Sequence, residues 1–176
     1  MGHLNVTSGG TANVTTLNSG SVDVAEGGVA NSTVVNNSGG LNVSSGGTAN
    51  VTTLSGGLTV SMGGVANSTT VNSLGDMVVS LGTANATIIN NSGELSVSGG
   101  TATETTVNSR GRIFVEAGGL VENTTVNDGG NGDALFLDDI YSAAPDIATR
   151  ARLSQVRQIV AGAGDDIIDL TSARFD

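Results

Sequence analysis

The residues best suited to chemistry lie near the end of the chain, in the segment AGAGDDIID at residues 161–169. Glycine turns leave backbone carbonyl oxygens accessible, and aspartates beside them supply hard anionic oxygens, the ligands that Ca²⁺ prefers. The sequence therefore predicts calcium as the one candidate cofactor. The alternative is that these are ordinary acidic residues in a solvated turn. The candidate ligands are Gly162, Gly164, Asp165, Asp166 and Asp169.

Catalytic residues would have to gather acids or bases on one face of the fold. The only histidine is His3, and the acidic pairs Asp138-Asp139 and Asp165-Asp166 are most simply solvated turn residues. The remaining acids of the first 127 residues fall at different positions of the repeat described below and form no cluster. We therefore expect no catalytic residues and no enzyme. These acids are Asp23, Glu26, Asp76, Glu94, Glu104, Glu116 and Glu122.

Charge and composition exclude several classes of partner. The formal net charge is -10, and the six basic residues are all arginines, so the chain offers little to nucleic-acid phosphates. There is no cysteine, which removes disulfides and thiolate metal sites. No run of about eighteen apolar residues is present, so we expect no membrane span.

Any functional residues would be positioned by a sequence repeat. Seven units of 17–19 residues can be aligned along the chain. Self-similarity at this period is typical of a solenoid. The third position of every unit is valine, most units have a Gly pair shortly after it, and a later position is always threonine. The units begin at Leu4, Val22, Leu41, Leu58, Met77, Leu95 and Ile113. The threonines are Thr15, Thr33, Thr52, Thr69, Thr87, Thr105 and Thr124.

Within each unit, positions of one kind recur at every second residue, which indicates short strands. Equivalent positions of the seven units form a column, and the residue types found in each column indicate which side of the strand faces inward. The position before each threonine accepts valine, serine, alanine, glutamate and asparagine, as at Val51 and Glu104, and is therefore expected to face outward. The threonines and the aliphatic columns should face inward. One unit cannot offset its own ordering cost, so the units must stack. We predict an all-β fold, a parallel β-helix (solenoid) of about seven coils with an irregular C-terminal cap.

The repeats resemble a known family. SGGTANVTTLNSG, GGVANSTVVNNSGG and SGGTATETTVNSRG are similar to the passenger repeats of AIDA-type autotransporter adhesins, over residues 4–130. This resemblance implies a β-helical, surface-displayed adhesin or stalk, with self-association and attachment to host surfaces as expected activities. The N-x-[ST] triplets, such as Asn13, Asn31 and Asn50, are better explained as structural asparagines in the turn register than as glycosylation acceptors.

The pattern breaks after residue 130, and we expect residues 131–176 to form a separate capping segment. Within it, residues 146–160 have the spacing of a short helix, while RQIV and DIIDL are alternatively strands. AGAGDDIID is similar to one nonapeptide of the RTX calcium-binding β-roll, so the segment also resembles the junction that precedes such repeats. That resemblance implies calcium ligation at the residues named above.

The sequence therefore favours a non-enzymatic module of a bacterial cell-surface or extracellular protein. We expect a rigid β-helical stalk that mediates self-association or attachment to a host glycan or protein. The first alternative is a calcium-dependent RTX-type module for folding and secretion. The second is a carbohydrate-active β-helix enzyme, which the scattered acids disfavour.

Overall fold

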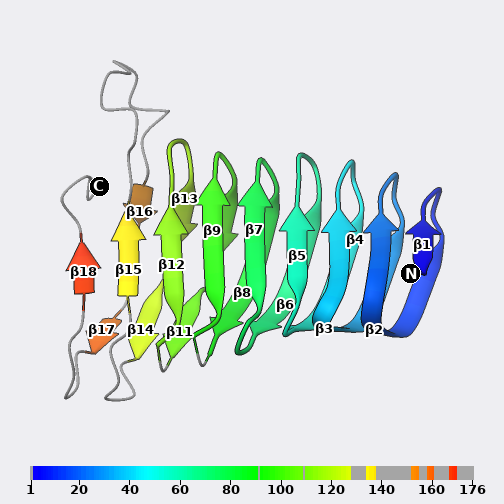
Figure 1. Cartoon of the computed structure of the whole chain (residues 1–176). Helices are drawn as coiled ribbons and strands as arrows, with labels where there is room; N and C mark the ends of the chain where they lie inside the picture. Colours follow the sequence, from blue (N-terminus) through cyan, green and yellow to red (C-terminus); the bar gives the residue numbers. More distant parts are fainter. Residues whose placement is uncertain are drawn as a thin grey trace.

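The described part of the molecule is a rod built only of strands. The computed structural model describes residues 2–90, 92–108, 110–127, 134–137, 152–154, 158–160 and 167–169. Its strands join in one 18-stranded sheet that winds as a parallel β-solenoid, with the successive coils side by side in Figure 1. The expected all-β parallel β-helix is confirmed, and no helix occurs in the described residues.

The strands follow one another around each coil. From the third coil onward, one strand spans the segment that begins near Thr-Ala-Asn, and the next strand spans the segment that contains the valine. In the sixth and seventh coils, the first of these strands is divided into two short ones. The strands are β1 (His3–Val6), β2 (Thr11–Val24), β3 (Val29–Val43), β4 (Thr48–Leu54), β5 (Gly57–Val60), β6 (Val65–Val71), β7 (Asp76–Ser80), β8 (Thr83–Ile89), β9 (Glu94–Ser98), β10 (Thr101–Thr103), β11 (Thr106–Asn108), β12 (Arg112–Val115), β13 (Leu120–Glu122), β14 (Thr125–Asn127), β15 (Ala134–Leu137), β16 (Arg152–Ser154), β17 (Gln158–Val160) and β18 (Ile167–Asp169).

Equivalent residues of the repeat stack on one another. Between β4 and β6, Ala49 pairs with Ala66 and Thr52 pairs with Thr69. The same columns continue from β6 to β8. Each coil therefore repeats the sequence of its neighbour because each side chain lies against its own counterpart one ladder step away, about 4.8 Å along the rod.

The core is the inside of this coil, and it contains almost no aromatic side chain. The valine, alanine and aliphatic columns are buried, with Val60, Leu54 and Ala66 each 0% exposed. The threonine column is buried with them from Thr33 to Thr124. The expected inward columns are therefore confirmed. Alanine, valine and threonine fill much of this interior, and leucine, isoleucine and methionine are its largest buried side chains.

The Gly pairs form the turns between strands, and the two glycines have different roles. The first, for example Gly46 with φ of 81°, adopts a left-handed conformation that costs glycine little. The second lies against the preceding coil: a Cβ on Gly64 would overlap the carbonyl oxygen of Val43. The second position has no space for a side chain, whereas the first favours glycine by its backbone conformation but is occupied by Leu81 with φ of 61° in the turn before Gly82.

A bend that the sequence analysis did not anticipate divides the first strand of each coil. The residue before the threonine has φ of 51–54° in all seven coils. Only one of these residues is an asparagine, which tolerates this conformation well, and two are β-branched valines, for which it is strained. The bend residues are Val14, Ser32, Val51, Ser68, Ala86, Glu104 and Asn123.

Strands also occur in the segment after residue 130. There β15 pairs with β12, β16 with β13, and β17 with β14, all in parallel, and β18 pairs with β15. Of the two alternatives for this segment, the structure has strands at residues 158–160 and 167–169. The division of the chain at residue 130 stays a prediction.

Candidate interaction surface

The rod has two long faces that differ in charge. The first, here called the neutral face, is the outward side of residues 11–17, 29–35, 48–54, 65–71 and 83–89, which contain no charged residue. The second, here called the charged face, is the outward side of β1, β5, β7, β9 and β12 and of the second half of β2 and β3. Its strands include His3, Asp23, Asp76, Glu94 and Arg112. This protein is acidic as a whole, yet one side of its rod is uncharged over about five coils.

A shallow groove runs across the coils of the neutral face, beside the bend. Its volume is about 290 Å³ and it is lined by bend residues and by the outward residues two positions further on. The lining is small and mostly uncharged, apart from Glu104 at the sixth coil. The main lining residues are Ser68, Thr70, Ala86, Ile88, Glu104 and Thr106.

Four large apolar side chains are exposed on the neutral face. Val14 is 81% exposed and Val51 is 57% exposed, both at the strained bend. Val34 and Ile88, in the outward column next to the bend, are also exposed. The other exposed large apolar residues of the described part are Leu4 on the charged face and Met62, Leu74 and Leu81 in turns. Exposed apolar side chains that gather on a surface are typical of contact with another molecule.

A ladder of side-chain amides runs along the rod at the residues directly before the bend. The Nδ2 of Asn50 donates to Oδ1 of Asn31 at 3.0 Å, and the Nδ2 of Asn67 donates to Oδ1 of Asn50 at 2.9 Å. The row continues from Asn13 to Asn85 and ends where Thr103 Oγ1 donates to Asn85. These asparagines are bound to each other within the strands, and not in the turns where the sequence analysis expected them.

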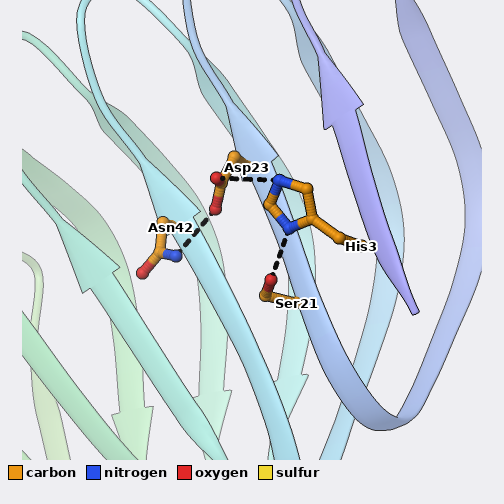
Figure 2. Close-up of polar contacts among 4 residues, drawn as sticks. All are labelled: His3, Ser21, Asp23 and Asn42. Atoms are coloured by element: carbon orange, nitrogen blue, oxygen red, sulfur yellow. Dashed lines mark hydrogen bonds and ion pairs between the residues drawn. The ribbon is translucent and has the colours of Figure 1, made fainter. Parts of the chain in front are cut away.

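The charged face holds one cluster with a serine, a histidine and an aspartate (Figure 2). His3 Nδ1 lies 2.6 Å from Ser21 Oγ, and His3 Nε2 lies 3.4 Å from Asp23 Oδ2. Asn42 Nδ2 donates to the other oxygen of Asp23 at 2.7 Å. The His3 and Asp23 side chains are 50% and 40% exposed, so the cluster lies open to water on a strand surface. It lacks the enclosed, preorganised surroundings that activate a serine nucleophile.

A second row on the charged face combines both signs of charge. Asp76 pairs in register with Glu94, and Glu94 with Arg112. Partial desolvation by the neighbouring coils raises the pKa of the Asp76 carboxyl above its ordinary value, although the side chain as a whole remains exposed. This row places two acids and then an arginine on successive coils, and it contains no acid–base pair enclosed from water.

The predicted calcium ligands lie mostly outside the described residues. Gly162, Gly164, Asp165 and Asp166 are not described, and of Asp169 only its place at the end of β18 is known. Calcium binding there stays a prediction. Within the described residues, no three His, Asp or Glu side chains are grouped closely enough to hold a metal ion. The described segments also contain no helix that is both long and apolar enough to cross a membrane.

The sequence analysis missed the bend residues as a functional feature. It recognised their column as outward but gave them no role. The signal was the spacing of inward residues: Ala49 and Thr52 both face inward, yet they lie three positions apart, which a straight strand does not allow.

Comparisons with known proteins agree with this rod. Residues 72–130 match the family model described as the adhesin of the bacterial autotransporter system, probable stalk. The crystal structure of a hyper-glycosylated TibA fragment, modified by TibC, is similar over 99% of this chain and 74% of that chain. Its TM-score is 0.54 and its sequence identity is 29%. A search of the curated proteins found no match.

These findings confirm the resemblance to autotransporter adhesin stalks for residues 72–130, within the wider range expected from the repeats. The molecule is a structural, adhesive β-helical module. The resemblance of residues 161–169 to an RTX nonapeptide stays a prediction.

Proposed function

We propose that this module is a stalk displayed at a bacterial cell surface or secreted from it, and that it self-associates side by side through its neutral face. The observation that supports this most directly is that the neutral face has no charged residue over five consecutive coils, in a chain with a net charge of -10. Two copies repel wherever acidic surfaces meet. Contact through the neutral faces avoids that repulsion.

The strained valines favour the same face. Left-handed backbone costs a β-branched residue about 1–3 kcal/mol. Val14 and Val51 adopt it while exposing their side chains, so neither gains compensating burial within the monomer. A partner that covers these two side chains would supply the missing burial.

The periodicity of the surface favours a second copy over other partners. Outward rows recur at the ladder spacing of about 4.8 Å along the rod. Another solenoid with the same spacing stays in register with these rows over many coils, whereas a globular partner matches them only locally. The described residues contain two aromatic residues, Phe114 and Phe136, which are paired in register on β12 and β15, so the stacking platforms common in sugar recognition are scarce there.

The test is a double variant, Thr53→Glu with Thr70→Glu, measured by sedimentation velocity against the parent chain. Both threonines face outward on the neutral face, and the new carboxylates would repel a second copy. We expect association to weaken at least tenfold, with an unchanged circular dichroism spectrum. The matched control is Thr59→Glu with Ser96→Glu, which adds the same charge to the charged face and should associate more nearly like the parent.

Two results would contradict the proposal. A parent chain that stays monomeric at high concentration excludes self-association and leaves attachment to a host surface as the function. Equal association of both double variants would place the contact on another face.

A further inference from the structure

Inside the rod runs a column of buried hydroxyl groups that the protein itself does not satisfy. The threonines of six successive coils are at most 1% exposed. Among the described residues, their Oγ1 atoms have no hydrogen-bond partner. Buried polar groups without partners are rare, and six in one row call for a physical explanation. The six are Thr33, Thr52, Thr69, Thr87, Thr105 and Thr124.

The ladder spacing explains why these threonines cannot bind each other. Thr52 stacks on Thr33 and Thr69 in register, so successive hydroxyls are about 4.8 Å apart, too far for a direct O–H···O bond of about 2.8 Å. The asparagine ladder meets the same spacing with a longer group. Its amide has a donor and an acceptor on different atoms, and Asn67 reaches Asn50 at 2.9 Å. A hydroxyl has one oxygen for both roles.

The surroundings of the column are small. Ala49 and Thr52 are the two inward residues that flank the bend at Val51, and the equivalent alanines continue along the rod. The rest of each coil is filled by larger aliphatic side chains such as Leu54 and Leu58. The bend side of the interior therefore combines the smallest side chains with the unpartnered hydroxyls.

We propose that a file of water molecules runs through the rod along this column, one between each pair of successive threonines. A water about 2.8 Å from two oxygens that are about 4.8 Å apart subtends an angle of about 120°, close to tetrahedral. Each threonine donates to one water and accepts from the next, and each water does the same. Each hydroxyl that lies between two waters then has both a donor and an acceptor partner, and the hydroxyls at the two ends of the column have one.

The threonine column is on this basis a binding site for water rather than a set of tolerated polar residues. Internal waters usually make two to four hydrogen bonds to buried polar groups and are costly to remove. An unpaired buried hydroxyl destabilises the fold, and six of them together would rival the whole net stability of a domain. Bridging waters remove this cost while keeping the narrow cross-section near the bend.

The first test is Thr69→Val, which replaces the hydroxyl by a methyl group of similar shape. If waters bind the column, the change leaves two waters without a partner, and the melting temperature falls. If the column is dry, the change removes an unsatisfied hydroxyl, and the melting temperature stays the same or rises. The matched control is Thr70→Val, one residue further on and outward-facing, which should change the melting temperature little.

The second test detects the water directly. A crystal structure at high resolution should contain ordered waters within hydrogen-bond distance of Oγ1 of successive threonines, and those on either side of residue 69 should be lost in Thr69→Val. In solution, nuclear Overhauser effects from long-lived water should reach the methyl groups of Thr52 and Thr87. Electron density without waters in the parent, or a Thr69→Val chain that melts at or above the parent temperature, would overturn the proposal.

Discussion

At the scale of single residues, the bend column shows how one backbone position shapes the surface. All seven bend residues are left-handed, yet their side chains include valine, alanine and glutamate. The position therefore requires a conformation and leaves the chemistry of the side chain open. This freedom lets the sequence place exposed apolar groups at Val14 and Val51 and a charge at Glu104 without altering the coil.

Replacing Val51 with asparagine should stabilise the monomer. Asparagine tolerates left-handed backbone much better than a β-branched residue, so Val51→Asn should raise the free energy of unfolding by about 1 kcal/mol. The matched control is Val65→Asn at the start of β6, because Val65 itself does not have a positive φ and loss of a strand-favouring valine there should destabilise the fold. Chemical denaturation of both variants checks this, and equal losses of stability would show that the bend is not strained.

At the scale of elements, inside and outside could be predicted because the strands alternate and every coil repeats the same columns. The inward columns, such as Val60 and Leu58, tolerate only aliphatic residues, since each is packed against a copy of itself. The bend could have been predicted only from the three-residue spacing of Ala49 and Thr52. The local preference of Val51 points to a straight strand and conceals it.

The surface was harder to predict than the core. That Asn50 binds Asn31 and Asn67 depends on the exact register of the coils. The asymmetry between the neutral and charged faces requires knowing which segments share a side of the rod. The candidate calcium ligands could be named from their residue types alone. Their arrangement in space depends on the geometry of the turn, which residue types do not determine.

The second glycine of each turn should be intolerant of any side chain. Gly64→Ala should lower the free energy of unfolding by about 2 kcal/mol because the new Cβ would overlap the Val43 carbonyl oxygen. Gly57→Ala is the control, since no atom lies within 4 Å of a Cβ at that position. We expect that variant to remain within about 0.5 kcal/mol of the parent or to gain slightly through lower unfolded-state entropy. Thermal melts of the pair test the distinction.

At the scale of the whole molecule, the net charge opposes association while the neutral face permits it. With six arginines against 16 acids, two rods repel at long range at neutral pH. Salt shortens that range, from about 30 Å at 0.01 M ionic strength to about 10 Å at 0.1 M. The uncharged contact itself should be little affected.

Self-association should therefore strengthen as salt is added. Sedimentation velocity at low and at physiological ionic strength should show a larger associated fraction at the higher one. Lowering the pH toward the sequence pI of about 4.1 should act in the same direction, because the carboxylates lose their charge. If association instead weakened with salt, ion pairs rather than the neutral face would hold the rods together.

The uniform parallel ladders also determine how the rod would respond to a pulling force. The hydrogen bonds between coils run along the rod axis, so tension on the two ends opens one coil at a time from an end. Each coil of about 18 residues that unfolds can extend to about 60 Å, whereas the folded rod becomes only about 5 Å shorter. A stalk of this construction lengthens in steps under load, which lets an attachment at its tip survive a sudden pull.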